Sequence, residues 1–297
     1  VSCLWLTWTA VILAIPNKKA SKNSQIDLKL LHASYKGSYA QAYDAITGGA
    51  NINCRDGKEG ATPLIIASRH GHETIASLLL DYGANFEILS ADGEKTALLM
   101  ASFSGNVDIV LDLLGRGASV DTTNQRGDTP LLLSCYNGNR DVVEVLLSRG
   151  ADINHRTIKQ QYSPLYVSTS AGYITVVKEL LKHEDSIQID IQDRTGTTPL
   201  IQSIDRQHIS IMMLLIEAGS NIELKDNSRL TPLLHAIRGN CIDCVELLLQ
   251  NNVNVNTKEH VSRYSPLMRA ASLGYHEIMV LLLDNGALTN ATVPLHD

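Results

Sequence analysis

The residues best suited to chemistry in this chain are a cysteine pair and a histidine pair. Cys241 and Cys244 form the only C-x-x-C, a spacing found in zinc sites and in redox-active dithiols. His70 and His72 place two imidazoles on either side of one glycine. A zinc site needs two further ligands at suitable spacing, and a redox pair is expected in a βαβ unit. We therefore interpret the cysteines as half-buried helix residues and the histidines as structural groups beside a loop.

No other set of residues points to catalysis. The sequence contains no G-x-x-x-x-G-K-[ST] loop and no G-x-G-x-x-G after a predicted strand. The other histidines are scattered along the chain and do not assemble with Ser and Asp, or with Cys, into a nucleophilic set. We predict a protein that is not an enzyme and that needs neither cofactor nor metal.

The overall composition excludes some function classes. The formal net charge of the 297 residues is -6, which argues against a nucleic-acid surface, since these usually carry a basic excess. The five cysteines are an odd number and widely spread, so a reducing compartment and a cytoplasmic location are expected.

A tripeptide of the form [TS]-[PA]-L recurs seven times at nearly constant spacing. The successive spacings are 34, 33, 34, 35, 33 and 34 residues. Thr or Ser is a favoured N-cap, and Pro suits the first position of a helix. Each tripeptide therefore predicts the start of a helix, and the seven starts are Thr62, Thr96, Thr129, Ser163, Thr198, Thr231 and Ser265.

Each of these units continues according to the same plan. Nine residues after the Thr or Ser, a tight loop needs left-handed backbone, and five units have Gly there. A second helix follows, with apolar residues at helical spacing such as Val142, Val145 and Leu146. It ends at a second left-handed cap, again usually Gly. In unit six, counted from Thr62, Asn240 and Asn252 take the two positions, and Asn tolerates this backbone next best.

These units resemble the ankyrin repeat family, whose 33-residue unit carries a T-P-L-H-x-A signature. The resemblance covers roughly residues 28–290, because Leu30, Ala33, Gly37 and Gly49 add an N-terminal unit at the same spacing. It implies an all-α fold, an α-solenoid of stacked helix pairs with β-hairpin-like fingers along one edge. Apolar residues and Tyr replace the signature His in every unit, which predicts a more apolar seam between helices: Ile65, Leu99, Leu132, Tyr166, Ile201, Leu234 and Met268.

The predicted organisation is an apolar segment with a short linker over 1–24 and a repeat domain over 25–297. Its units start near 28, 62, 96, 129, 163, 198, 231 and 265. Residues 1–16 are uncharged, but a 16-residue helix reaches only about 24 Å, short of a bilayer core of about 30 Å. A truncated membrane helix, a signal-like segment, an apolar cap and a sequence artefact all stay open, so membrane association through 1–16 is possible. The absent initial Met and the unit-like Pro294-Leu295-His296 suggest a fragment of a larger protein.

The junction of units four and five departs from the pattern. The segment after Leu181 lacks the terminal Gly and carries one extra residue, and Gln207 stands at the tight loop of unit five. We predict a bend or a soft interface over 182–210.

The resemblance also implies a binding surface. In ankyrin arrays the two residues before each tight loop face the concave groove, and aromatic or Arg side chains there are suited to interface hot spots. The groove candidates are Arg69, His70, Phe103, Tyr136, Asn137, Asp205, Arg206 and Arg238. Basic residues of the fingers are the second set: Arg55, Lys58, Arg126, Arg156, Lys159 and Arg229.

Two alternatives stay open for these residues. The finger edge is either a solvated surface of mixed charge or an attractor for an acidic protein segment. Phe103 either packs under a finger or, with Tyr136 on the next unit, anchors a partner; in the second case replacement by Ala weakens binding and leaves stability nearly unchanged.

The predicted function is a protein–protein interaction module or adaptor that acts as a monomeric array. Its partner is another protein, of unknown identity, rather than nucleic acid. Two alternatives are the cytosolic ankyrin portion of a membrane protein such as a channel or acyltransferase, and the substrate-recognition arm of an enzyme such as a ubiquitin ligase or kinase.

Overall fold

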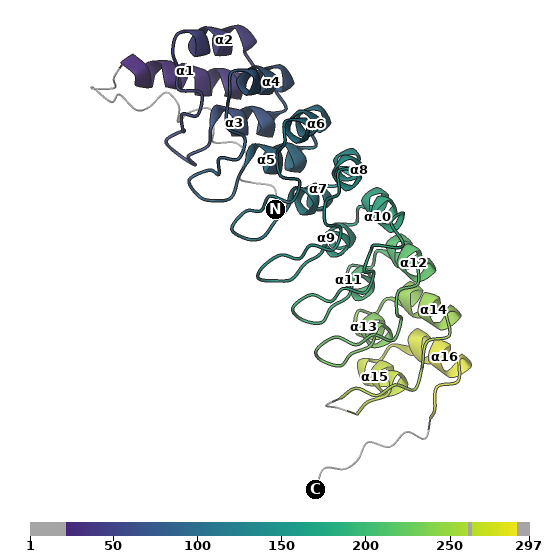
Figure 1. The fold of residues 1–297 in the computed structure, drawn as a ribbon. Helices are drawn as coiled ribbons and strands as arrows, with labels where there is room; N and C mark the ends of the chain where they lie inside the picture. Colours follow the sequence, from purple (N-terminus) through teal and green to yellow (C-terminus); the bar gives the residue numbers. More distant parts are fainter. Residues whose placement is uncertain (1–21, 261–262, 290–297) are drawn as a thin grey trace.

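The computed structural model describes residues 22–260 and 263–289, and this part of the chain is all-helical, as predicted. Sixteen helices stack as eight pairs into a curved rod (Figure 1). The inner row consists of α1 (Lys22–Lys36), α3 (Pro63–His70), α5 (Ala97–Ser104), α7 (Pro130–Asn137), α9 (Pro164–Ala171), α11 (Pro199–Asp205), α13 (Pro232–Arg238) and α15 (Pro266–Leu273). The outer row consists of α2 (Tyr39–Thr47), α4 (Glu73–Asp81), α6 (Val107–Gly115), α8 (Arg140–Ser148), α10 (Ile174–Leu181), α12 (Ile209–Glu217), α14 (Ile242–Gln250) and α16 (His276–Asp284). The apolar segment 1–16, the linker up to residue 21 and the last unit-like residues lie outside the described part.

The inner helices from α3 to α15 begin where the tripeptides predict. In all seven, the Thr or Ser hydroxyl accepts the backbone N–H three residues later. In unit one, for example, Ile65 N lies 3.3 Å from Thr62 Oγ1. Each cap satisfies a donor that a helix end leaves unpaired, so the N-cap prediction is confirmed.

The tight loops also have the predicted left-handed backbone. Gly138, between α7 and α8, has a φ of 79°, and a Cβ there would meet the Tyr173 ring at 2.8 Å. Asn240 and Asn252 adopt φ of 49° and 59° in the unit that lacks both glycines. Gln207 holds the same geometry at 55°, without the tolerance of Gly or Asn.

The core is a thin apolar layer that runs the whole length of the array between the two helix rows. Five of the residues that replace the signature His are buried: Ile65, Leu99, Leu132, Ile201 and Leu234. The prediction of an apolar seam is confirmed at these units. Unit four differs, because the hydroxyl of the buried Tyr166 donates to Gln202 Oε1 at 2.9 Å.

The fingers form one continuous edge, although no strand occurs among the described residues. Each finger is closed by a backbone bond across its base, such as Ser90 N to Lys95 O at 2.8 Å. Neighbouring fingers are joined by a bond from an amide of the later finger to a carbonyl of the earlier one. These bonds are Ala91 N to Glu59 O, Gln125 N to Gly93 O, Ile158 N to Arg126 O, Arg194 N to Gln160 O and Asn227 N to Thr195 O.

The junction of units four and five is loosely packed on its outer side. Helix α10 ends at Leu181, and an additional turn follows before the chain enters the next finger. A cavity of about 180 Å³ opens there, lined by Leu181, Glu184, Ile187, Ile189, Glu217 and Ala218. The irregular sequence therefore coincides with incomplete packing.

The cysteine pair differs from its prediction. Cys241 and Cys244 are joined by a disulfide, and both are buried rather than half-buried. Cys241 is the N-cap of α14, and its Sγ accepts the Cys244 amide at 3.2 Å. The interpretation as ordinary helix thiols was wrong because a cap and the residue three positions later meet in one turn. Cys54 and Cys135 are buried free thiols.

Candidate protein-binding surface

A groove of about 500 Å³ lies between the fingers and the inner helices of units two to four. Helices α5, α7 and α9 form its floor, and fingers three (121–128) and four (155–162) form its wall. Its lining combines aromatic, aliphatic and basic residues: Phe103, Arg126, Asp128, Leu132, Leu133, Tyr136, Thr157, Lys159, Gln160, Tyr162 and Val167. Such a mixture suits an amphipathic segment of another chain.

Three aromatic side chains dominate the groove, and they differ in exposure. Tyr136 is 61% exposed and therefore free to contact a partner. Tyr162 stacks on Tyr166 with ring centroids 4.6 Å apart, so its ring is held rigidly. Phe103 is half-buried and packs against the buried cluster that contains Leu99. Its replacement by Ala is therefore expected to cost stability, whereas contact of Phe103 with a partner stays a prediction.

Two basic residues of the finger set border the groove. Arg126 is 71% exposed in its side chain and pairs through Nε with Glu94 at 3.1 Å, which leaves its terminal nitrogens outward. Lys159 is exposed and makes no ion pair with any residue of 22–260 or 263–289. The finger side of the groove therefore offers the Lys159 ammonium and an Arg126 guanidinium that is paired with Glu94.

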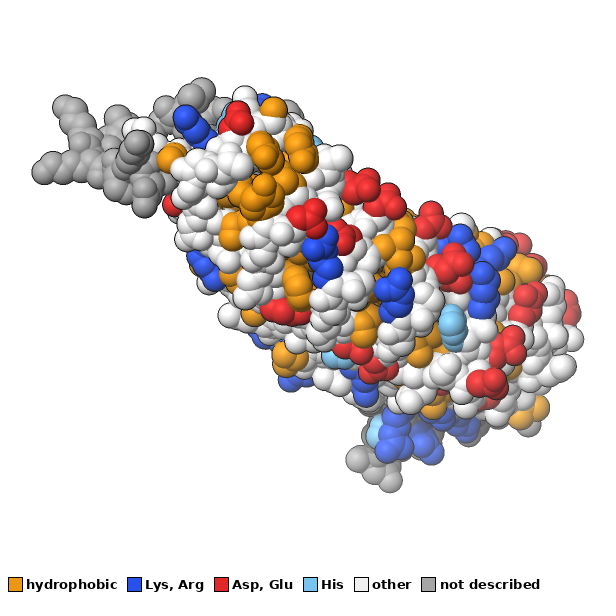
Figure 2. Space-filling view, turned by 45° about the horizontal axis from the view of Figure 1, so that its top comes forward, with side chains coloured by type: hydrophobic (Ala, Val, Ile, Leu, Met, Phe, Trp, Pro, Cys, Tyr) orange, Lys and Arg blue, Asp and Glu red, His pale blue; other side chains and the backbone are white. Residues whose placement is uncertain are grey.

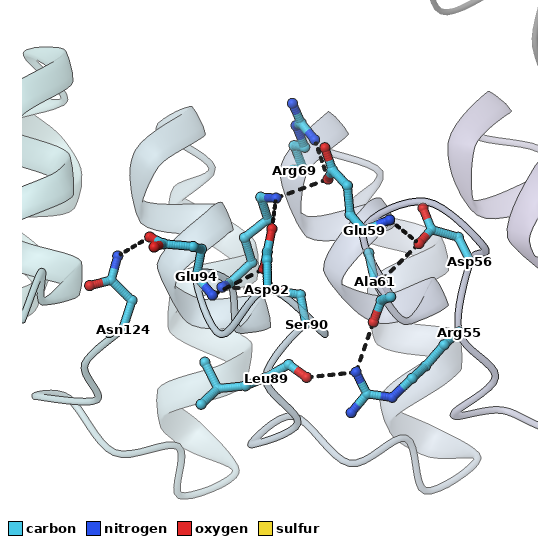
Figure 3. Close-up of polar contacts among 12 residues, drawn as sticks. Arg55, Asp56, Glu59, Ala61, Arg69, Leu89, Ser90, Asp92, Glu94 and Asn124 are labelled. Atoms are coloured by element: carbon cyan, nitrogen blue, oxygen red, sulfur yellow. Dashed lines mark hydrogen bonds and ion pairs between the residues drawn. The ribbon is translucent and has the colours of Figure 1, made fainter. Parts of the chain in front are cut away.

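Two other predicted residues, Arg55 and Arg69, form hydrogen bonds or ion pairs within the array itself (Figure 3). Glu59 pairs with Arg69 at 3.3 Å and with Lys95 of the next finger at 3.0 Å. Lys95 also pairs with Asp92 at 2.9 Å. Arg55 Nη1 donates to the carbonyls of Gly60 and Leu89, each at 2.9 Å, and so bridges fingers one and two. At these fingers the cations stabilise neighbouring units instead of facing solvent unpaired.

The loop residues of units one to three also join neighbouring units. Asn137 Nδ2 donates to the Phe103 carbonyl at 2.7 Å. The exposed His70 ring lies edge-on to Tyr35, with centroids 4.7 Å apart. His72 contacts the Tyr35 carbonyl through Nε2 at 3.1 Å, which supports the structural interpretation of this histidine. No group of three or more His, Cys, Asp or Glu side chains within the described ranges is arranged to hold a metal.

A half-buried histidine, His235, contacts a predicted groove residue of unit five, Asp205. His235 Nδ1 lies 2.9 Å from Asp205 Oδ1, and its Nε2 lies 3.3 Å from Asp226 Oδ2. Burial acts to lower the pKa of His235, but the bonds and charges of the two carboxylates outweigh it and raise the pKa above 6.5. The exposed carboxylate of Asp205 is therefore engaged by a side chain of the next unit.

The remaining predicted residues lie on the surface of units four to six or at the first finger. Arg206, Arg229 and Arg238 are exposed and make no ion pair within the described residues. Arg156 donates to the Gln192 carbonyl of the next finger, and Lys58 is exposed at the tip of finger one. The groove residues Phe103, Tyr136, Arg126 and Lys159 are thus brought together, whereas Arg55, Arg69 and His70 belong to unit one and do not line the groove.

Sequence reasoning missed part of the groove lining. Tyr162, Leu133 and Val167 were not among the candidates, although Tyr162 immediately precedes the N-cap Ser163. That position lies at the base of the finger, and the Tyr162 ring stacks on Tyr166 of α9, the inner helix of the same unit. An aromatic residue one place before a capping Thr or Ser was the usable signal.

The fold and the site define a class of protein: a solenoid of helical repeats that presents a groove and a loop edge for binding. A family model described as ankyrin repeats (3 copies) matches residues 30–124, 155–226 and 218–293, and a single ankyrin repeat model matches 126–158. The chain belongs to the ankyrin repeat family. Ankyrin repeats generally mediate protein–protein interactions and are not catalytic modules.

Individual relatives agree with this assignment. The chain is 30% identical over 212 residues to the putative ankyrin repeat protein FPV031 of fowlpox virus, which is 70% of this chain and 51% of that protein. It is 25% identical over 154 residues to ankyrin repeat and SAM domain-containing protein 6 of Danio rerio, 52% of this chain and 21% of that protein. The matches thus span about half or less of these relatives.

A solved structure shares the fold. The crystal structure of the human ASB11 ankyrin repeat domain superposes with a TM-score of 0.67 at 24% identity. The superposition covers 77% of this chain and 99% of that domain. Among the helices that the structure describes here, none is both long and apolar enough to cross a membrane.

Proposed function

We propose that this chain is a binding module that docks a segment of another protein in the groove of units two to four. The observation that carries the proposal is the juxtaposition of Tyr136, 61% exposed, with the rigid Tyr162 ring and the unpaired Lys159 around one cavity of about 500 Å³. An exposed aromatic beside a fixed aromatic offers a large contact area at little entropic cost.

The position of the groove supports this proposal. Its floor lies on α5, α7 and α9, whose helices pack on a buried core and on one another. Its wall consists of fingers that are bonded to their neighbours on both sides. A partner would therefore meet a surface that is already ordered, and less entropy is lost on binding.

Site-specific crosslinking tests the proposal. A photo-reactive amino acid replaces Tyr136 in the full chain, and the protein is irradiated in a lysate of the source cell. The matched control carries the same amino acid in place of Tyr82, a 48% exposed tyrosine at the end of the outer helix α4. We expect an adduct from position 136 that is absent from position 82.

Competition completes the test. An excess of unlabelled chain should suppress the adduct, and the same excess of the Tyr136→Ala chain should suppress it far less. Tyr136 is largely exposed, so this variant should unfold at the same temperature as the parent. Identical adducts at positions 136 and 82, or none at 136 from a folded chain, would exclude the groove as the binding surface.

A further inference from the structure

We infer that the segment bound in this groove is acidic and extended, and that its carboxylates pair with a basic track on units four to six. The basic track consists of Lys159, Arg194, Arg206, Lys225, Arg229 and Arg238. The inference rests on the proposed function, because Lys159 belongs both to the groove and to the track.

The cations of the basic track are available to a partner. All six side chains are exposed, and none makes an ion pair with any residue in 22–260 or 263–289. They lie on fingers four, five and six and at the ends of the inner helices α11 and α13 beside them. Figure 2 shows Lys and Arg side chains gathered at the lower edge of the array.

The carboxylates of the same units are engaged in their own turns. Asp193 Oδ1 accepts the amides of Thr195 and Thr197, each at 2.8 Å. Asp226 accepts the Leu230 amide at 2.8 Å and also lies against His235. These two carboxylates keep their charge but direct their oxygens into the fingers, whereas the six cations of the basic track are exposed to a partner.

The first two fingers show the opposite arrangement. There Lys95 lies between Glu59 and Asp92, and Arg69 shares Glu59 (Figure 3). Those cations are neutralised by neighbours at 2.9 to 3.3 Å. The positive charge is therefore concentrated on units four to six, and a partner that follows it must run from the groove toward the C-terminal units.

The spacing of the units indicates how such a partner is arranged. Packed helices lie about 8–10 Å apart, so each unit advances the finger edge by roughly that distance. An extended chain advances about 3.3 Å per residue. Roughly every third residue of the partner therefore meets a new finger, and acidic residues at that interval would match the track.

A protein segment fits this surface better than a nucleic acid. The whole chain carries a net charge of -6, so a long polyanion would be repelled by the acidic remainder. The groove in line with the track has an apolar floor formed by Leu132, Leu133 and Val167. A segment with a bulky apolar side chain followed by spaced carboxylates would fit both the apolar floor of the groove and the basic track.

Fluorescence anisotropy with synthetic peptides tests the inference on the full chain. The probe is a labelled 16-residue peptide with one Leu near its start, Glu at every third position after it, and Gly and Ser elsewhere. Its control has Gln in place of each Glu. We expect the Glu peptide to bind about tenfold more tightly or better, and the difference to shrink at high salt.

Charge reversals locate the contact. The double variant Lys159→Glu/Arg194→Glu should weaken binding of the Glu peptide about tenfold. The matched double variant Arg149→Glu/Lys178→Glu makes the same change of net charge at exposed positions on the outer helix row and should leave affinity unchanged. Equal losses in the two double variants would overturn the inference, because they would reflect net charge alone.

Two further outcomes contradict it. Equal affinity for the Glu and Gln peptides would show that the carboxylates are not recognised. Duplex DNA that binds as tightly as the Glu peptide, and more weakly to the Lys159→Glu/Arg194→Glu variant, would show that the surface binds nucleic acid instead of an acidic protein segment. If a partner crosslinked from position 136 binds the Lys159→Glu/Arg194→Glu chain as tightly as the parent, the proposed function of the groove stands and only the inference about the basic track is wrong.

Discussion

The imidazole Nδ1 of His235 lies 2.9 Å from Oδ1 of Asp205, so a histidine of unit six holds the carboxylate at the groove end of unit five. The other ring nitrogen faces Asp226 of finger six. One side chain thereby links the inner helix α11, the inner helix α13 and a finger.

This link predicts a pH dependence of stability. The raised pKa of His235 in the folded chain means that its charged bonds contribute fully below pH 6.5 and are lost as pH rises through the folded value. The unfolding free energy should fall by about 1 kcal/mol over that rise in pH. His235→Gln should make the unfolding free energy less dependent on pH, while replacement of the exposed His276 serves as the control. An unchanged pH dependence in His235→Gln would contradict the link.

The buried pair of Tyr166 and Gln202 gives a second prediction. Tyr166→Phe leaves Gln202 Oε1 without its donor, and Gln202 is only 7% exposed, so a loss of about 1–2 kcal/mol is expected. Tyr162→Phe keeps the stacked ring and should change stability little. Chemical denaturation measures both. The double variant Tyr166→Phe/Gln202→Leu removes both polar groups and should recover much of the loss; a further loss would contradict this account.

The left-handed residue of unit five gives a third prediction. Gln207 adopts a φ of 55°, where a residue with a Cβ is strained by about 1 kcal/mol. Gln207→Gly should therefore raise the melting temperature. The gain is reduced because the variant also loses one exposed hydrogen bond, from the Gln207 side chain to the Gly239 carbonyl. Gly138→Ala should lower it, because the added Cβ meets the Tyr173 ring. A lower melting temperature for Gln207→Gly would refute strain at this loop.

The junction of units four and five gives a fourth prediction. The outer side over 182–210 contains a cavity of about 180 Å³ and the half-buried Ile187 and Ile189. In unit three, by contrast, Val142 and Leu146 are completely buried. Amide hydrogen exchange should show earlier opening over 182–210 than over 130–150. Uniform protection across the two segments would contradict a soft interface.

The sequence predicts most of the fold because its rules are local. A hydroxyl before Pro-Leu caps a helix whatever surrounds it, and a left-handed position needs Gly or Asn for steric reasons. That is why the starts of α3 to α15 and the tight loops are where the sequence places them. The disulfide was missed for a related reason: Cys241 and Cys244 were both interpreted as helix residues, whereas Cys241 is the cap itself.

The binding surface is less predictable because it depends on which side chains find partners inside the array. Lys95 and Lys159 are both finger lysines, yet two carboxylates hold the first and no ion pair within the described residues holds the second. Asp205 appeared to be a groove residue, and only the packing of α13 brings His235 to it. Such contacts span about one repeat length, and no local rule states which rotamers meet.

The backbone bonds between fingers of the described residues all run the same way, from an amide of the later finger to a carbonyl of the earlier one. Each of these bonds closes a donor and an acceptor that an exposed loop edge would otherwise offer to another molecule. At these positions a partner cannot pair with the finger backbone and has to be recognised through finger side chains. The side chains of one finger can therefore change, and the binding preference with them, without altering the backbone bonds that join that finger to the next.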